Sequence, residues 1–371
     1  MKILIVSHSY VAAENLKNII ELSKSASVRI IVPDHVADRV IGKVTNDEET
    51  PVDRLVFKRI SLPRNQYLLA SKGFGMLSFS PDIVHIEYDP WAPIFWQTLI
   101  FKALFARKAK LVCTVKKNTY RPLPQPLQAA KLWLTRLLLT QVDCLFAVNT
   151  GVQKIYQSRF GVRDEDIVLV QHLGVDTELF KPSQKSLTTS RTMKIGYCGR
   201  LDENKGLRIL YQAVQSIKSS SDAEVELHLL GDGPLKEELQ ARQEGWLYLA
   251  PPVSHNEVAD FLKPLDIFVM PALITPDHEE HDGHALMEAM SCGIACVGTP
   301  SGIIPELLDE GTGVICRAGD VKDLTEALHA LINSSDLRSE MGAKGRAKIV
   351  EDCSISALGS QKLQLYESIL A

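Results

Sequence analysis

Two glutamates stand on either side of a glycine in the stretch H-E-E-H-D-G-H-A-L-M-E-A-M-S-C-G, residues 278–293. Glu280 lies just before Gly283, and Glu288 lies after it. The apolar residues after Gly283 recur with helical spacing, which predicts that a helix begins near this glycine. The first N–H groups of a helix can bind an anion or a sugar hydroxyl, and a carboxylate accepts two hydroxyls at once. The stretch therefore fits a cradle for an anionic ligand that is rich in hydroxyl groups.

The same stretch also contains potential metal ligands. His278, His281 and His284 recur at every third position, and Asp282 lies among them. Imidazole and carboxylate groups are common ligands of zinc and iron. The spacing is not that of an H-E-x-x-H helix, and the histidines fall on an expected loop. A metal site and a solvated acidic loop thus remain as alternatives to the cradle.

A second segment offers cations for a phosphate group. Tyr197–Gly206 reads Y-C-G-R-L-D-E-N-K-G, in which Gly199 permits a close turn at the end of an expected strand. Arg200 and Lys205 then stand in the loop that leads to an expected helix. An arginine fork and a lysine ammonium beside a helix N-terminus suit a diphosphate. Two solvated charges in a turn are the competing interpretation.

A glycine-rich turn follows another expected strand. Gly231 and Asp232 belong to L-L-G-D-G-P-L-K-E-E-L, residues 229–239, which has the first two glycines of a dinucleotide fingerprint. Lys236 stands where the third glycine would be. A tight turn with Pro234 in the first helical turn explains the segment at least as well.

These segments need strands and helices to position them. The alternation of apolar strands and amphipathic helices predicts two α/β sheets, separated by the polar segment Lys181–Thr192. Ligands of open α/β sheets bind outside the carboxyl ends of the strands, which is where the segments above fall. The expected strands are Lys2–Val6, Val28–Val32, Ile83–Ile86, Leu111–Val115, Cys144–Val148, Lys194–Cys198, Val225–Leu230, Ile267–Met270 and Ala295–Gly298.

Composition excludes several other classes of protein. A chain of 371 residues suits two domains, and a net charge of −4 does not indicate a nucleic-acid binder. The seven cysteines are scattered without a C-x-x-C pair, so we expect reduced thiols in a cytoplasmic protein. No apolar run reaches the length of a membrane span.

Several short motifs occur in an order that is typical of one enzyme family. G-R-L-x₃-K-G is followed by G-D-G-P-L, by Glu280 and Glu288, by E-A-M-S-C-G and by G-T-P-S-G-I-I-P-E. Together with H-L-G-V-D-T-E-L-F-K-P at residues 172–182, these motifs resemble the GT4-type (group 1) retaining glycosyltransferases of the GT-B fold. The resemblance is densest from His172 to Gly319.

The resemblance implies a fold class and a domain organisation. It implies an α/β protein of the GT-B fold, with two Rossmann-like domains whose parallel sheets face a central cleft. The N-terminal domain, residues 1–178, would serve the acceptor, and the C-terminal domain, residues 179–371, would bind the nucleotide sugar. A final helix, about residues 354–371, would pack back on the N-terminal domain.

The resemblance also implies roles for individual residues. Arg200 and Lys205 would bind the donor diphosphate and support its departure, and Glu280 would face the transferred sugar. His85, in D-I-V-H-I-E-Y-D-P, matches a cleft histidine of the first domain, and a satisfied core histidine at a strand end is the alternative. Glu288 would hold the ribose hydroxyls. The expected donor-binding residues are Gly199, Gly231, Asp232, Gly283, His284, Ala285, Leu286 and Glu288.

The chain departs from the family pattern at three points. Asp282 replaces a common aromatic residue, Glu87 stands where a second histidine is common, and Val11–Glu14 replaces a common Gly-Gly pair. These positions bear on the donor sugar and the acceptor, whose identities the sequence leaves open.

The function implied by the resemblance is transfer of a sugar from a nucleotide-diphosphate donor to a hydroxyl of a saccharide or lipid-linked acceptor. The anomeric configuration would be retained, as in bacterial polysaccharide or glycolipid biosynthesis. We expect no cofactor and no metal, because the cations would stabilise the departing diphosphate. An epimerase or oxidoreductase that binds a nucleotide, and a non-catalytic partner subunit, are the alternatives.

One apolar segment has two interpretations. Residues 126–139 combine leucines with Lys131, Trp133 and Arg136. Such a helix could lie on an anionic membrane surface, at the cytoplasmic face, or it could pack on the sheet of the first domain.

Overall fold

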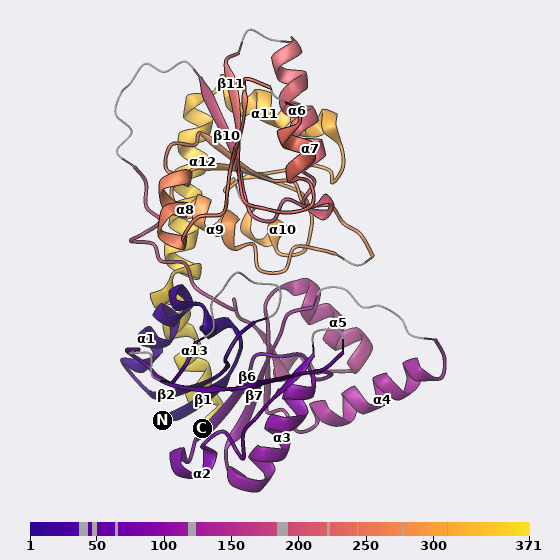
Figure 1. Ribbon diagram of the computed structural model, residues 1–371, viewed down its shortest axis with the longest axis vertical. Coiled ribbons are helices and arrows are strands. Elements are labelled where there is room, and N and C mark those ends of the chain that lie inside the picture. Colours follow the sequence, from indigo (N-terminus) through magenta and orange to yellow (C-terminus); the bar gives the residue numbers. More distant parts are fainter. Residues whose placement is uncertain are drawn as a thin grey trace. The chain divides into compact units, whose positions relative to one another are not determined.

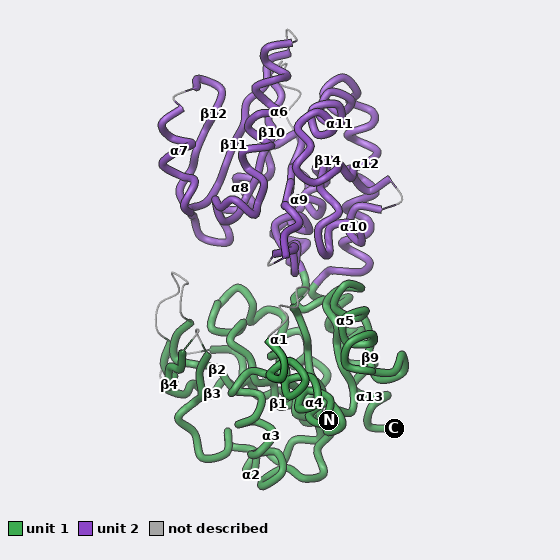
Figure 2. Tube along the Cα trace, turned by 90° about the vertical axis from the view of Figure 1, so that its right-hand side faces the viewer, with its two compact units in different colours: residues 1–117, 121–174, 355–371 green, residues 118–120, 175–354 purple. Residues whose placement is uncertain are grey.

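The computed structural model describes residues 1–36, 44–46, 50–63, 66–117, 124–183, 192–220, 223–242, 244–276, 278–309 and 311–371. The chain divides into two compact units (Figure 2). Unit 1 consists of Met1–Lys117, Arg121–Gly174 and Ile355–Ala371, and unit 2 is built on Val175–Ser354. The end of the chain therefore belongs to the same unit as its beginning.

Unit 1 contains a sheet of seven parallel strands in the order β3-β2-β1-β6-β7-β8-β9. Two short strands, β4 (Arg59–Ser61) and β5 (Tyr67–Leu69), form a separate antiparallel pair. The strands of the main sheet are β1 (Lys2–Val6), β2 (Ser27–Pro33), β3 (Asp53–Phe57), β6 (Ile83–Ile86), β7 (Lys110–Val115), β8 (Cys144–Ala147) and β9 (Ile167–Leu169).

Helices connect these strands, and the last helix of the chain joins them (Figure 1). Helix α13 packs beside α1, and Leu358 and Tyr366 of α13 enter the apolar cluster formed by β1 and its neighbours. The helices of unit 1 are α1 (Leu16–Ser23), α2 (Met76–Phe79), α3 (Pro93–Phe105), α4 (Leu127–Leu139), α5 (Thr150–Phe160) and α13 (Ile355–Leu370).

Unit 2 contains six parallel strands in the order β12-β11-β10-β13-β14-β15. The strands are β10 (Met193–Cys198), β11 (Val225–Leu230), β12 (Leu247–Ala250), β13 (Ile267–Met270), β14 (Ala295–Gly298) and β15 (Val314–Ile315). The helices are α6 (Leu207–Ser220), α7 (Lys236–Gln240), α8 (His255–Leu262), α9 (His284–Ser291), α10 (Ile304–Leu307), α11 (Val321–Asn333) and α12 (Ser335–Lys348).

The sheet of unit 2 is covered on both faces. Successive side chains of a strand point to opposite faces, and β13 shows this alternation clearly. Ile267 and Val269 belong to the apolar cluster with α6 and α11, whereas Phe268 and Met270 belong to the cluster with α8 and α9. A parallel sheet that is buried on both faces explains why its strands are continuous apolar runs in the sequence.

The predicted strands agree closely with the structure, and the two parallel α/β sheets confirm the predicted fold class. Lys2–Val6, Ile83–Ile86, Val225–Leu230, Ile267–Met270 and Ala295–Gly298 coincide with β1, β6, β11, β13 and β14. The short edge strands β3, β9, β12 and β15 were not predicted. The predicted linker Lys181–Thr192 falls largely outside the described residues. Among the helices that the structure describes, none has both the length and the apolar character to cross a membrane.

Candidate functional site

Three loops at the carboxyl edge of the unit 2 sheet are hydrogen-bonded to one another. They follow β10, β11 and β13. The N–H of Leu201 donates to the carbonyl of Asp232 over 2.8 Å, and the N–H of Leu273 donates to the carbonyl of Asn204 over 2.8 Å. The predicted segments around Arg200, Gly231 and Glu280 therefore lie on loops that support each other.

Glycine is required where two of these loops touch. Gly231 has a φ of +146°, and a Cβ there would lie 1.9 Å from the carbonyl oxygen of Gly199. Gly206 has a φ of +68°, and a Cβ there would lie 1.9 Å from the carbonyl oxygen of Pro271. The positive φ and the clash of a Cβ with a carbonyl oxygen both exclude a larger residue at these two positions. The G-D-G segment is thus a tight turn, and the Asp232 carboxylate accepts the N–H of Gly233 within it.

The two predicted cations differ in their surroundings. The Arg200 side chain is 63% exposed and lies 3.3 Å from the Asp202 carboxylate. The Lys205 ammonium is mostly buried and forms an ion pair with Glu280, with 2.6 Å between Nζ and Oε2. The loop after β10 thus carries the exposed guanidinium of Arg200 and the ion-paired ammonium of Lys205.

Helix α9 begins at Gly283, as the sequence predicts. Gly283 is left-handed, with φ +60°, and no side chain caps the helix. The N–H groups of the first helical turn, those of His284, Ala285 and Leu286, have no acceptor within a helix and carry its positive end. Glu280 lies in the loop that leads to this turn, and its N–H donates to the Ser301 hydroxyl over 3.1 Å. The loop before α9 therefore carries the carboxylate that pairs with Lys205.

Glu288 is buried inside α9 and is bound by a histidine that the sequence analysis missed. Its Oε1 lies 2.8 Å from Nε2 of His255, the first residue of α8. Phe180 packs edge-on against the His255 ring, 5.1 Å between centroids. A capping box formed by Ser254 and Glu257 fixes the start of α8. That S-H-N-E pattern in the sequence could have located the helix start, but nothing in it indicated the partner of Glu288.

The histidine-rich segment does not form a metal cluster among the residues that the structure describes. No group of three or more His, Cys, Asp or Glu residues in that part of the chain is close enough to hold an ion. The rings of His278 and His281 are 6.4 Å apart. Burial lowers the pKa of both histidines below the usual value, against the opposing effect of nearby carboxylates such as Glu280.

His85 lies elsewhere, in the core of unit 1. It is fully buried on β6, and both ring nitrogens have partners, the Tyr366 hydroxyl at 2.6 Å and the Thr114 hydroxyl at 2.7 Å. Burial, followed by the charges of Lys362 and Lys116, lowers its pKa well below the usual value. This is the environment of a satisfied core histidine, the alternative that the sequence analysis left open.

A buried polar network lies near His85. Oε1 of Glu87 accepts the Tyr10 hydroxyl over 3.1 Å and lies 3.7 Å from Nδ1 of His172. The Lys362 ammonium, on α13, donates to the carbonyl of His172 over 2.7 Å. Burial lowers the pKa of Lys362 to about 8, against the opposing effect of Glu87. The carboxyl edge of the unit 1 sheet therefore holds charges that are closed off from solvent.

Comparison with known proteins identifies the class of protein. Residues 181–348 match the profile of the glycosyl transferases group 1, and residues 21–171 match that of a glycosyl transferase 4-like domain. A glycosyltransferase from Rickettsia africae aligns with 100% of the chain and 98% of its own length, at 16% identity and a TM-score of 0.74. Anabaena HepE in complex with UDP-glucose aligns with 99% of the chain and 100% of its own length, at 17% identity and a TM-score of 0.68. At these identities the structures show the fold alone, which is GT-B.

Two enzymes are similar to this chain in sequence. The alpha-maltose-1-phosphate synthase of Mycolicibacterium smegmatis is 24% identical over 64% of this chain and 66% of its own length. A GDP-mannose-dependent mannosyltransferase of Corynebacterium glutamicum, which acts on a monoacylated phosphatidylinositol monomannoside, is 28% identical over 63% of this chain and 64% of its own. The chain thus matches just under two thirds of these relatives. Because the two profiles together span both units, the chain belongs to the group 1 (GT4-type) glycosyl transferases.

Proposed function

We propose that this protein transfers a sugar from a nucleotide-diphosphate donor to a hydroxyl group of a saccharide or lipid-linked acceptor, with retention of the anomeric configuration. The observation that carries the proposal is the convergence of Arg200, Lys205 and the start of α9 at one edge of the unit 2 sheet. The carboxyl edge of a parallel sheet is where such folds bind nucleotides. Unit 2 is therefore the donor-binding unit, and unit 1 the acceptor-binding unit.

The contacts of unit 2 suggest how the donor is held. Arg200 is exposed enough to grip a diphosphate with two parallel hydrogen bonds, and Lys205 adds a compact charge. The N–H groups of His284, Ala285 and Leu286 bind phosphate or sugar oxygens. Glu288, oriented by His255, accepts the two ribose hydroxyls, and its lone pairs leave room for both.

The chemistry requires stabilisation of a leaving diphosphate. The bond between the anomeric carbon and the diphosphate oxygen breaks, and its electron pair leaves with the nucleotide diphosphate. The acceptor hydroxyl bonds to the anomeric carbon and loses its proton to the departing diphosphate. Arg200 and Lys205 stabilise the charge that develops on that leaving group. Glu280, which holds Lys205 in place, faces the transferred sugar. We assign no role to His85, because both of its ring nitrogens are already hydrogen-bonded within the core.

The nucleotide sugars named for the similar proteins differ: the mannosyltransferase depends on GDP-mannose, and HepE is in complex with UDP-glucose. The acceptors named for the relatives include a monoacylated phosphatidylinositol mannoside, which supports a glycolipid or polysaccharide product here.

A nucleotide screen tests the proposal directly. UDP, GDP and ADP and their sugars are titrated into the protein by calorimetry, and melting temperatures are measured in parallel. We expect one nucleotide series to bind and to raise the melting temperature, since a ligand that binds only the folded state stabilises it. Product analysis with the bound sugar then shows transfer or hydrolysis. Lack of affinity for every nucleotide would contradict the proposal, and binding without turnover would favour a non-catalytic partner subunit.

A further inference from the structure

Arg346 of α12 joins two segments of unit 2 that are far apart in the sequence. Its Nη1 donates to the carbonyl of Phe180 over 2.7 Å and to the carbonyl of Ser291 over 2.6 Å. Its Nη2 donates to the carbonyl of Thr177 over 3.1 Å. Ser291 is the last residue of α9, whereas Thr177 and Phe180 lie near the start of unit 2. One guanidinium therefore holds both the end of α9 and the segment that begins the unit.

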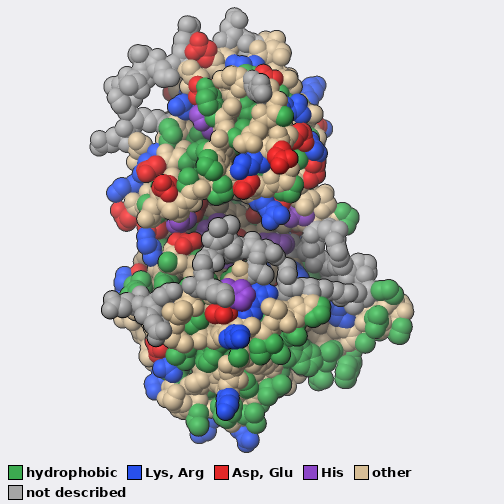
Figure 3. All heavy atoms as spheres, viewed as in Figure 1, with side chains coloured by type: hydrophobic (Ala, Val, Ile, Leu, Met, Phe, Trp, Pro, Cys, Tyr) green, Lys and Arg blue, Asp and Glu red, His purple; other side chains and the backbone are tan. Residues whose placement is uncertain are grey.

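The acceptors of this guanidinium are buried. Figure 3 shows acidic and basic side chains interspersed on the surface of unit 2, where an exposed ion pair contributes little to stability. Arg346 instead donates to the backbone of Phe180 and Ser291, two residues that are completely buried. Hydrogen bonds from a charged donor are stronger than those between neutral groups. We therefore expect Arg346 to fix the positions of both segments.

Close packing of α12 on the end of α9 supports this contact. A Cβ at Gly342 of α12 would lie 2.1 Å from the carbonyl oxygen of Gly293, so only glycine allows the helix to come this close. The Ser291 hydroxyl also donates to the carbonyl of Phe180 over 2.5 Å. The two segments that Arg346 binds are thus also joined directly to each other.

Both segments lead to the Glu288 carboxylate. The ring of Phe180 packs edge-on against the ring of His255, with 5.1 Å between centroids. Nε2 of His255 lies 2.8 Å from Oε1 of Glu288. Glu288 itself lies on α9, about one helical turn before Ser291. The contacts form a closed ring: one side passes through Phe180 and the imidazole, the other follows α9, and the two sides meet at the guanidinium of Arg346.

We infer that Arg346 is a positioning residue of the donor site, which holds the Glu288 carboxylate where the ribose hydroxyls of the nucleotide bind. The inference rests on the ribose contact proposed for Glu288. A carboxylate accepts two neighbouring hydroxyls only in a suitable orientation, and holding it there before the ligand arrives lowers the cost of binding. Arg346 acts through His255 and through α9, and it does not contact the nucleotide.

The preference for a ribonucleotide over its 2′-deoxy analogue measures this positioning. UDP, GDP and ADP and their 2′-deoxy analogues are titrated into the wild type and into Arg346→Met by calorimetry. We expect the preference of the wild type to fall by about fivefold in the variant, because the carboxylate no longer meets both hydroxyls well. The ratio of two affinities measured on the same folded protein is not changed by a loss of stability alone.

A second arginine of α12 provides the matched control. Nη1 of Arg338 donates to the backbone carbonyls of Leu331 and Ile332, near the end of α11. Arg338→Met removes the same kind of contact at another helix end, so it should lower the melting temperature and leave the ribonucleotide preference unchanged. Arg346→Lys retains a positive donor and should restore part of the preference that Arg346→Met loses.

A change in the aromatic ring tests the same connection without removing a charge. Phe180→Leu should also lower the ribonucleotide preference, because His255 loses the ring that packs against it. The double variant Arg346→Met/Phe180→Leu should lose less than the sum of the two single losses, since both changes act on the same imidazole. Phe180→Leu provides this test even if Arg346→Met does not fold.

The outcomes separate this inference from the proposed function. An unchanged ribonucleotide preference in Arg346→Met, or in Phe180→Leu if the first variant does not fold, would overturn the inference. Equal losses of preference in Arg338→Met and Arg346→Met would also overturn it, because any weakening of unit 2 would then have the same effect. Failure of the wild type to bind any of the nucleotides would contradict the proposed function itself.

Discussion

The main sheets of the two units are both parallel, but the charged groups at their carboxyl edges differ in how exposed they are. In unit 1 the polar groups at that edge are enclosed: Glu87 is 1% exposed, and Tyr10 and Lys362 are buried around it. In unit 2 the corresponding edge carries Arg200, which is largely exposed, and Lys205, which is held by Glu280.

This difference has a consequence for where a ligand can bind. A ligand must be able to reach the groups that bind it, and the Glu87 carboxylate and the Lys362 ammonium are almost fully enclosed. The histidine on β6 illustrates this, since Thr114 and Tyr366 occupy both of its nitrogens. In unit 2, by contrast, an exposed guanidinium and the first turn of α9 keep their donors accessible. We therefore expect anion binding at the edge of unit 2 and a structural role for the network of unit 1.

Removing the exposed cation of unit 2 should give the largest effect. Arg200→Ala should lower the rate of sugar transfer by about 10²-fold, because one donor to the leaving group is lost. Its guanidinium is mostly in solvent, so the melting temperature should hardly change. Lys205→Ala should lower the rate similarly and also lower stability, since the partly buried ion pair between Lys205 and Glu280 is lost.

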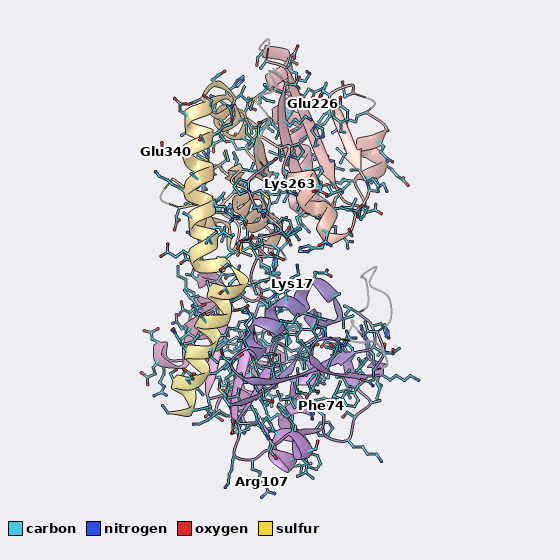
Figure 4. The ribbon with its side chains drawn as sticks, turned by 90° about the vertical axis from the view of Figure 1, so that its left-hand side faces the viewer. Lys17, Phe74, Arg107, Glu226, Lys263 and Glu340 are labelled. Atoms are coloured by element: carbon cyan, nitrogen blue, oxygen red, sulfur yellow. The ribbon has the colours of Figure 1, made fainter. Side chains whose placement is uncertain are left out.

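A cation at the other end of the sheet provides the control. Lys263, which is labelled in Figure 4, follows α8 and precedes β13 at the amino edge of the sheet, and it pairs with Asp260. Lys263→Ala should keep the full rate. If Lys263→Ala and Arg200→Ala lowered the rate of sugar transfer equally, or if neither lowered it, a cation at the carboxyl edge would have no special role in the reaction.

The buried ammonium of unit 1 should appear in the pH dependence of stability. The pKa of Lys362 falls from 10.5 to about 8 on folding because burial disfavours its charge. Between these values the unfolded chain binds more protons than the folded one, so this group makes folding more favourable as the pH rises from 8 to 10.5. The gain should approach 3 kcal/mol, with about 1.4 kcal/mol for each pH unit.

A difference measurement isolates this contribution from the buried cysteines and tyrosines. Denaturant unfolding of the wild type and of Lys362→Met is followed across pH 7 to 10. The difference in the free energy of unfolding should move in favour of the wild type above pH 8 and stay level below it. Lys322→Met, on the exposed face of α11, is the matched control. A flat difference for Lys362→Met would mean that its ammonium is not enclosed as described.

The sequence predicted the elements well because buried parallel strands are continuous apolar runs. β1, β6 and β13 could be located from Lys2–Val6, Ile83–Ile86 and Ile267–Met270 alone, since each run ends in turn-forming or polar residues. The start of α9 at Gly283 was also predicted from the sequence. Family resemblance then indicated GT-B, which the structural comparisons confirm.

Long-range pairs could not be predicted in this way. Lys205 and Glu280 are far apart in the chain, and so are His255 and Glu288, so local periodicity carries no information about either pair.

The smallest expected effect concerns the two buried carboxylates, each of which lies beside a histidine. Glu288→Gln should weaken binding of the nucleotide by about 10-fold, because an amide is a poorer acceptor for two ribose hydroxyls than a carboxylate. Calorimetry with the nucleotide and its 2′-deoxy analogue gives the sharper measurement. The wild type should prefer the ribonucleotide, and the variant should lose most of that preference.

Glu87→Gln is the matched control, because Glu87 in unit 1 is buried near His172 much as Glu288 is buried near His255. If only the carboxyl edge of unit 2 binds the donor, Glu87→Gln should leave nucleotide affinity unchanged while lowering the melting temperature, since the Tyr10 hydrogen bond is altered. Both carboxylates are buried beside a histidine. A difference in nucleotide affinity between the two variants would therefore come from the unit in which each carboxylate lies. A loss of nucleotide affinity in Glu87→Gln equal to that in Glu288→Gln would remove the distinction between an enclosed edge and an accessible one.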